Sequence, residues 1–390
     1  MKRKICVITG SRAEYWLLKP LIEKLKEDKD ITLQILATGM HLSSDFGLTY
    51  KDIERDGFYI DKKIDIHLNS DTPSGIAKSM GLALEGFTKA YGRFKPDIVV
   101  LLGDRFEIFS AACAAYISRI PIAHINGGEV TSGAFDDAFR HSITKMSSLH
   151  FVSAKEYRKR VIQLGERPDA VFNVGAITCD SIHKTKFLDK KEIERKLGFR
   201  FNKYNILITF HPATLERNTA KQQFKNLLDA IDGLKDTNFI FTKSNADTGG
   251  KAINKMIDEY AAKNSRKAKA FASLGHLKYF SVMKVADVVL GNSSSGIIEA
   301  PILKIATINI GDRQKGRLKT KSIIDCKPVK PDIQKALKLA FSNKFKITVR
   351  NVKNPYYKRN VAGNIKKIIK EFPLGENILK KSFFDIKHNF

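Results

Sequence analysis

The sequence predicts an α/β protein that contains two doubly wound parallel sheets in tandem. Short runs of β-branched and other apolar residues alternate with amphipathic stretches of helical length, as in parallel strands joined by covering helices. The chain has 390 residues, which is more than one hydrophobic core ordinarily serves. The alternation starts again after a polar helical stretch at residues 176–199. We therefore expect two Rossmann-like domains.

The apolar runs are short and lie between turn-forming residues, as expected of buried strands. In the first half we predict strands at 4–9, 32–38, 97–102, 120–125, 150–152 and 171–174, and helices at 14–26, 73–91, 105–118, 135–146 and 154–164. In the second half we predict strands at 205–210, 239–242, 268–271, 288–290 and 305–308, and helices at 220–234, 251–263 and 362–371. The expected domains are 1–175 and 176–353, followed by a closing segment at 354–372 and a basic tail at 373–390.

The composition excludes several classes of protein. The formal net charge is +27, but the basic residues are spread along many helices and no nucleic-acid-binding motif appears, so we expect no nucleic-acid partner. No run approaches the roughly 20 apolar residues of a membrane span, and no signal-peptide pattern is present, so a cytoplasmic protein without membrane contact is expected. The four cysteines are far apart, which predicts reduced side chains and no metal site.

Charged residues follow the predicted strands of the first half, where ligands bind in this architecture. Arg12 stands in Gly10-Ser11-Arg12-Ala13-Glu14-Tyr15, at a helix N-terminus suited to phosphate. This segment lacks the G-x-G-x-x-G fingerprint, which disfavours an NAD-dependent oxidoreductase. Further carboxylates follow later strands: Asp104, Glu129, Asp136 and Asp137. Each one alone fits a helix cap or a first-turn charge, but together they favour proton transfer.

Strand ends of the second half carry groups that suit a nucleotide. His211 ends a strand, and the proline after it favours extended backbone that projects the imidazole outward. The segment Gly291-Asn292-Ser293-Ser294-Ser295-Gly296 leads from a strand into a helix that contains Glu299. Backbone amides and hydroxyls there can surround a diphosphate, and Arg313 adds a cation after the last strand. The carboxyl-end loops of the two sheets are expected to line one cleft.

In this order the motifs resemble those of the hydrolysing UDP-N-acetylglucosamine 2-epimerases of bacterial sialic acid synthesis. The likeness runs from residue 5 to about 372 and includes 9–15, 38–41, 103–107, 127–129, 140–146, 163–166, 244–249, 291–299 and 306–317. It implies a GT-B fold, a helix at 354–372 that returns to the first domain, a homodimer, and a reaction without cofactor or metal. The implied reaction eliminates UDP to give 2-acetamidoglucal and then adds water, which yields N-acetylmannosamine.

The resemblance also implies roles for individual residues. UDP-sugar binding is carried over to Arg12, His41, His211, Ser293, Ser294, Ser295, Gly296, Glu299 and Arg313. Acid–base work is carried over to Asp104 and Asp136, with Asp137 as the adjacent alternative. Many relatives carry Glu where this chain has Asn126, whose amide exchanges no useful proton at neutral pH. Glu129 is the candidate for part of that role, and the alternative is that it only orders the loop.

Three alternatives to UDP-N-acetylglucosamine turnover stay open. The first is the same reaction on UDP-2,4-diacetamido-2,4,6-trideoxyglucose, the legionaminic acid precursor, which differs at C4 and C6 of the sugar. The second is a GT-B glycosyltransferase, which would share the donor site but need an acceptor. The third is a binding protein without catalysis, which the positive charge suggests.

Overall fold

A computed structural model describes residues 2–68, 70, 72–132, 135–213, 219–244 and 249–386. The chain divides into two compact units, of which the first comprises Met1–Glu129, Asp136–Ser181 and Tyr356–Phe390, and the second comprises Val130–Phe135 and Ile182–Pro355. The first unit thus extends beyond the predicted boundary at 175, and it takes in the closing segment from Tyr356 onward together with the tail. Residues 245–248 of the matching stretch 244–249 lie outside the described residues.

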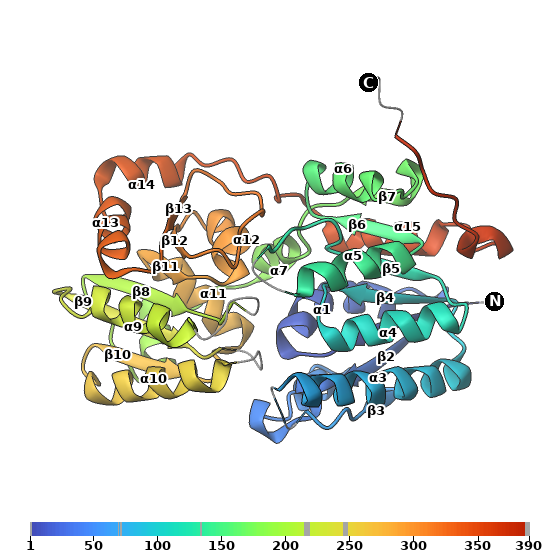
Figure 1. Cartoon of the computed structure of the whole chain (residues 1–390), viewed down its shortest axis with the longest axis horizontal. Helices are drawn as coiled ribbons and strands as arrows, with labels where there is room; N and C mark the ends of the chain where they lie inside the picture. The colour runs from blue at the N-terminus through green and yellow to red at the C-terminus, as the bar shows by residue number, and fades with distance from the viewer. Residues whose placement is uncertain are drawn as a thin grey trace. The chain divides into compact units, whose positions relative to one another are not determined.

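The first unit contains a seven-stranded parallel sheet in the order β3-β2-β1-β4-β5-β6-β7 (Figure 1). Its strands are β1 (Arg3–Thr9), β2 (Ile31–Thr38), β3 (Lys62–Ile64), β4 (Ile98–Leu102), β5 (Ile122–Ile125), β6 (Leu149–Val152) and β7 (Val171–Asn173). Its helices are α1 (Arg12–Lys26), α2 (Tyr50–Arg55), α3 (Pro73–Phe94), α4 (Phe106–Ile117), α5 (Asp136–Met146), α6 (Lys155–Gln163) and α15 (Val361–Glu371), and α7 (Thr178–Lys184) leads into the second unit.

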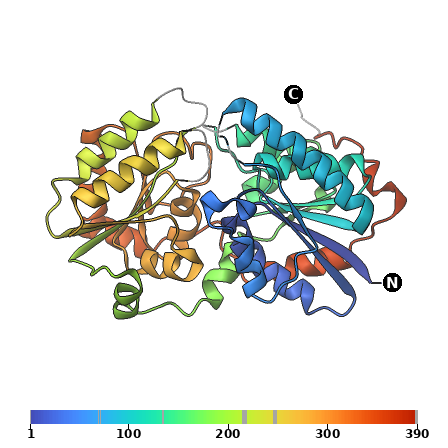
Figure 2. The same cartoon turned by 90° about the horizontal axis from the view of Figure 1, so that it is seen from below.

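Helices cover both faces of this sheet because its strands are apolar on both sides. Figure 2 shows α3 and α4 on one side and α1 and α15 on the other. The C-terminal helix α15 is attached to the N-terminal part of the chain: Lys366 and Lys370 pair with Asp28 at 2.7 and 2.8 Å, and the Arg3 guanidinium donates to the carbonyl of Ile369 at 2.6 Å. The chain thus returns to the first unit at its end.

The second unit contains a six-stranded parallel sheet in the order β10-β9-β8-β11-β12-β13. Its strands are β8 (Tyr204–Thr209), β9 (Thr237–Thr242), β10 (Ala268–Phe271), β11 (Val288–Gly291), β12 (Ala306–Ile310) and β13 (Ile323–Cys326). Its helices are α8 (Lys190–Leu197), α9 (Ala220–Ile231), α10 (Gly250–Lys263), α11 (Gly275–Val285), α12 (Ser294–Ile302), α13 (Lys330–Ala340) and α14 (Asn343–Arg350). Separate hydrophobic clusters fill the two faces of the sheet.

The predicted fold is confirmed: the chain has the two Rossmann-like parallel-sheet domains of the GT-B class. The prediction missed β3 and β13, and both are short strands at the edge of their sheet. Lys62 and Lys63 in β3 and Asp325 in β13 are exposed, so neither segment has the apolar pattern of a buried strand.

Among the described residues, no helix is long and apolar enough to cross a membrane. No group of three or more histidine, cysteine, aspartate or glutamate side chains there is arranged to hold a metal ion.

Candidate active site

The strand order of the first unit reverses between β1 and β4, which are neighbours in the sheet. At such a switch point the loops leaving the carboxyl ends of the two strands diverge and leave room for a ligand. The loop after β1 leads to Arg12, and the loop after β4 contains Asp104. Two residues singled out in the sequence therefore lie where this topology places its ligands.

Arg12 is the first residue of α1, and Ser11 is the N-cap of that helix. The Ser11 hydroxyl accepts a hydrogen bond from the backbone N–H of Glu14 at 3.4 Å, which fixes the first turn. Arg12 is half-buried, burial lowers the pKa of its guanidinium, and among the described residues it forms no hydrogen bond or ion pair. Unused donors on a cation at a helix N-terminus suit phosphate oxygens.

His41 is fully buried beside this turn. Its Nε2 lies 3.0 Å from the hydroxyl of Thr9, and its Nδ1 lies 2.9 Å from the hydroxyl of Thr49. Burial lowers the pKa of His41 to about 4, so the imidazole is neutral at pH 7. This arrangement favours a role in holding the end of β1 over direct contact with a substrate.

Two buried carboxylates lie beneath the same loops. Glu14 accepts a hydrogen bond from the N–H of Gly10 at 2.7 Å, and Glu107 packs so closely that a Cβ on Gly10 would lie 2.7 Å from its Cγ. Arg105 Nε donates to Glu107 at 2.7 Å and lies 4.0 Å from Glu14. Burial raises the pKa of Glu14 to about 8, Glu107 acts in the same direction, and Arg105 opposes it. We did not predict this pair as site residues.

Glu14 is expected to make the stability of the protein fall as the pH rises. Its folded-state pKa of about 8 lies above the ordinary value of 4.5, so folding favours the protonated form. That contribution is complete below pH 4.5 and is lost as the pH rises through about 8. The Glu14→Gln variant lacks this loss, and we expect its melting temperature to exceed that of the wild type by about 2–4 °C or more near pH 9.

Thermal melting at about pH 6 and pH 9 checks this prediction. Glu27→Gln, an exposed change at the other end of the same helix, is the matched control and should follow the wild type. Equal destabilisation of Glu14→Gln at both pH values would contradict the prediction.

Arg140 on α5 joins two of the loops that carry candidate carboxylates. Its side chain is 2 % exposed, and its guanidinium donates to Asp137 Oδ1 at 2.9 Å and also to Asp104 Oδ2. A further hydrogen bond of 2.9 Å reaches the carbonyl of Glu129. We call Asp104, Asp137 and Arg140 the carboxylate cluster. Asp136, the carboxylate favoured over Asp137 in the sequence, is half-buried at the first position of α5.

The turn that follows β5 supports this cluster. Asn126 has a φ of 69°, in the left-handed region that asparagine tolerates better than most residues. Gly128 has a φ of 76°, and a Cβ there would lie 2.6 Å from the carbonyl of Tyr157. Glu129 is 2 % exposed, and its Oε1 accepts a hydrogen bond from Ser153 at 2.9 Å. That burial favours the loop-ordering alternative for Glu129, and its part in proton transfer stays a prediction.

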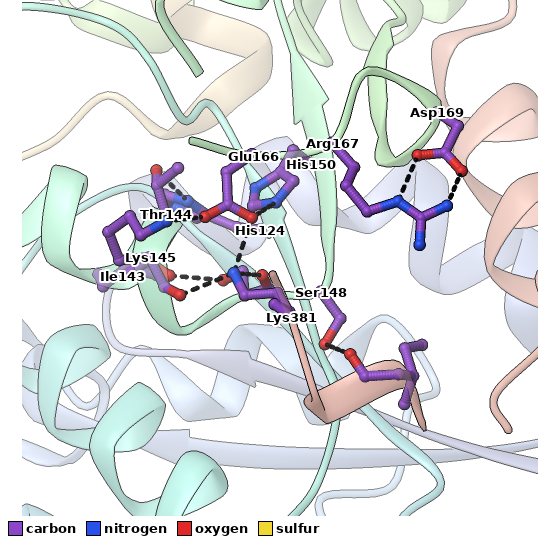
Figure 3. Close-up of polar contacts among 12 residues, drawn as sticks. His124, Ile143, Thr144, Lys145, Ser148, His150, Glu166, Arg167, Asp169 and Lys381 are labelled. Atoms are coloured by element: carbon purple, nitrogen blue, oxygen red, sulfur yellow. Dashed lines mark hydrogen bonds and ion pairs between the residues drawn. The ribbon is translucent and has the colours of Figure 1, made fainter. Parts of the chain in front are cut away.

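His124, on β5 just before this turn, connects the loop of Asp104 to α5. Its Nε2 donates to the carbonyl of Gly103 at 2.8 Å, and its Nδ1 lies 3.2 Å from the hydroxyl of Thr144 on α5 (Figure 3). Burial lowers the pKa of His124 to about 3, so the ring is neutral. We interpret His124 as a buried support for Asp104.

The second unit has its own switch point between β8 and β11. Asn292 lies there and is 2 % exposed. Its side-chain amide forms two hydrogen bonds with the backbone of His211: Oδ1 accepts from the N–H and Nδ2 donates to the carbonyl, each at 2.7 Å. The His211 ring is held at Nδ1 by Ser244 at 3.1 Å. Sequence reasoning placed Asn292 in an anion-binding turn and missed that its side chain is committed to the backbone.

Three serines open α12 directly after Asn292. Ser293 is the N-cap, its hydroxyl accepts from the N–H of Ser295 at 3.4 Å, and all three serines are half-buried. Gly296 allows α12 to approach β12, because a Cβ there would lie 2.8 Å from Cγ2 of Thr307. The first-turn amides and hydroxyls can bind an anion. We call residues 292–296 the anion seat.

Further groups of the second unit adjoin the anion seat. Arg313 Nη1 donates to the carbonyl of Asn292 at 3.1 Å, which places this cation beside the seat. Glu299 lies on α12 and is 8 % exposed. The N–H and hydroxyl of Ser132 donate to the carbonyl of Lys315 at 3.2 and 3.4 Å, so the segment after Glu129 packs on the loop that carries Arg313.

Comparison with known proteins identifies the family. Residues 23–370 match a family model described as UDP-N-acetylglucosamine 2-epimerase. A GDP/UDP-N,N'-diacetylbacillosamine 2-epimerase (hydrolyzing) of Campylobacter jejuni is 49% identical over 88% of this chain and 89% of its own length. Polysialic acid biosynthesis protein P7 of Escherichia coli is 42% identical over 98% of both chains.

Solved structures agree on the fold. The UDP-GlcNAc 2-epimerase of Neisseria meningitidis, bound to UDP-GlcNAc, superposes with a TM-score of 0.76 at 18% identity and covers 94% of this chain and 98% of its own. At that level of identity the likeness shows the architecture alone.

Proposed function

Because this chain belongs to the UDP-N-acetylglucosamine 2-epimerase family, we propose that it is a hydrolysing 2-epimerase of a UDP-linked 2-acetamido sugar. In the proposed reaction the bond between C1 and UDP breaks as the C2 proton leaves, which forms a 2-acetamidoglucal. Water then adds across the double bond, with hydroxyl to C1 and a proton to the opposite face of C2. The products are the free 2-epimeric sugar and UDP.

In the proposed reaction, the anion seat holds the diphosphate as it leaves. The amides at the start of α12, the hydroxyls of Ser293, Ser294 and Ser295, and the guanidinium of Arg313 supply donors and positive charge. Asn292 keeps these groups in place, because its amide ties the end of β8 to the end of β11. We assign His211 and Glu299 to the nucleoside, and Arg12 of the first unit to phosphate.

The observation that carries the proposal is the carboxylate cluster. A buried arginine holds the carboxylate of Asp104, on the loop after β4, and that of Asp137, in the first turn of α5, so each has a fixed orientation. Proton removal from C2 needs a general base, a role that a carboxylate can fill, and proton return to the opposite face needs a second group. We propose Asp104 as one of these groups, and Asp136 or Asp137 as the other.

We propose UDP-N,N'-diacetylbacillosamine as the substrate, with UDP-N-acetylglucosamine as the second candidate. The Campylobacter jejuni relative at 49% identity carries the first sugar in its name, and this identity exceeds the 42% of the polysialic acid protein. The second candidate is favoured by the family description and by our sequence interpretation.

Product NMR in deuterated water tests both the reaction and the substrate. We expect free UDP and a 2-epimeric sugar that carries deuterium at C2, with a higher kcat/KM for UDP-N,N'-diacetylbacillosamine than for UDP-N-acetylglucosamine. The GDP-linked diacetylbacillosamine forms a third arm, because the relative's name includes GDP. The opposite order of kcat/KM would overturn the substrate assignment alone.

The same experiment distinguishes the other classes. A glycosyltransferase would release UDP only after an acceptor is added, whereas the proposed enzyme releases UDP from the donor alone. Absence of both epimerisation and deuterium incorporation with all three sugars would refute the proposed reaction.

A further inference from the structure

The C-terminal tail is bound to the first unit at two backbone positions. After α15 the chain forms a short 3₁₀ turn, Glu376–Leu379, where the carbonyl of Ile378 accepts a hydrogen bond from the Ser148 hydroxyl at 3.5 Å. Further on, the N–H of Phe384 donates to the carbonyl of Gly165 at 2.9 Å. The residues between these two positions are thereby held against the end of α5, as Figure 3 shows for Lys381.

Lys381 closes the C-terminal end of α5. Its ammonium group donates to the carbonyl of Lys145 at 2.7 Å and to the carbonyl of Ser147 at 2.6 Å. The last carbonyls of a helix have no partner within the helix and carry a partial negative charge, so a cation there satisfies and stabilises them. The side chain of Lys381 is 22% exposed, which limits its freedom to move.

Glu166 ties this lysine to two further elements. Its Oε2 accepts from Lys381 at 2.7 Å and from His150 Nε2 on β6 at 3.0 Å, and its Oε1 accepts from Lys145 Nζ on α5 at 2.6 Å. Burial alone would raise the pKa of Glu166, but His150, Lys145 and Lys381 together lower it to about 2. An ionised, 3 % exposed carboxylate therefore connects the tail, α5 and β6 (Figure 3).

The helix that Lys381 closes is the helix that carries Asp137 and Arg140. It has eleven residues, so a shift along its axis moves both ends together. Such a shift would displace the Arg140 guanidinium from Asp104, which lies on a loop outside the helix. The geometry points to Lys381 as a positioning residue for proton transfer: it fixes α5 so that Arg140 holds Asp104 and Asp137 in place. This inference rests on the proposed function.

The test compares Lys381→Ala with Lys380→Ala, because Lys380 is the exposed neighbour and loses the same charge. For Lys381→Ala we expect kcat to fall about 10- to 100-fold, with KM and the Kd for UDP nearly unchanged. The isotope effect with substrate deuterated at C2 should increase, because proton transfer becomes more rate-limiting. Loss of folded protein alone would lower kcat without changing the isotope effect. Lys380→Ala should match the wild type, and Lys381→Arg should recover most of kcat.

Hydrogen exchange supplies a readout that does not depend on turnover. We expect faster amide exchange throughout Asp136–Met146 in Lys381→Ala, and wild-type exchange in Lys380→Ala. Unchanged exchange along α5, or equal kcat in the two alanine variants, would overturn the inference. A wild type that turns over no nucleotide sugar would refute the proposed function, while the exchange of α5 would still decide whether Lys381 positions the helix.

Discussion

Asp104→Asn is expected to lower kcat by about 10²- to 10⁴-fold while the Kd for UDP stays within about twofold. Asparagine has nearly the same shape and can still accept a hydrogen bond from Arg140, but it cannot take up a proton at neutral pH. UDP binding is expected to persist, because the proposed nucleotide contacts are made chiefly by the anion seat. A UDP-release assay and calorimetric titration with UDP check the two parts of this prediction.

Two further variants help to identify the cause of the loss. Asp137→Asn also takes one carboxylate away from Arg140 while Asp104 remains, so it reports the disturbed guanidinium together with any proton-transfer role of Asp137. Asp169→Asn, an exposed aspartate paired with Arg167, should have no effect. We expect Asp104→Asn to be the most impaired of the three. Wild-type turnover in Asp104→Asn would remove this residue from the mechanism.

The parts of the fold that the sequence predicted are those with strong local patterns. Buried strands such as β4 are continuously apolar, and helices such as α5 begin with acidic residues. The edge strands β3 and β13 were not predicted. Each pairs with one neighbouring strand at the edge of its sheet, and such a strand needs no apolar sequence pattern. The attachment of the tail to α5 was not predicted, because one half-buried lysine, Lys381, produces no periodicity.

Site residues could be predicted where a motif follows a strand. Contacts between site residues could not be predicted where the two residues are distant in sequence. Arg12, Asp104 and the serines were found because strand ends carry function in this architecture. Asp137 and Arg140 are three residues apart on a helix, so their pairing could have been read from spacing. The contact of Arg140 with Asp104 bridges thirty-six positions, and no local pattern encodes it.

Replacing Arg140 is expected to have the largest combined effect on stability and turnover. Arg140→Met removes a 2 % exposed cation and leaves the carboxylates of Asp104 and Asp137 without their shared partner. Breaking a fully buried ion pair by deleting one member costs about 3–5 kcal/mol, and we expect a smaller cost here because the side chains of Asp104 and Asp137 are 21% and 26% exposed. The freed carboxylates also lose their fixed orientation. We expect a lower free energy of unfolding in urea and a kcat reduced at least as much as in Asp104→Asn.

Arg140→Lys separates charge from geometry in the same cluster. A lysine restores the positive charge, but its single ammonium cannot present the planar set of donors that reaches Asp104, Asp137 and the carbonyl of Glu129 together. Stability should therefore recover further than kcat does. The exposed Arg167→Met serves as the control and should leave both unchanged. Full turnover in Arg140→Met would show that proton transfer does not depend on the contacts of Arg140 with Asp104 and Asp137. Equal recovery of stability and kcat in Arg140→Lys would show that only the charge of residue 140 matters.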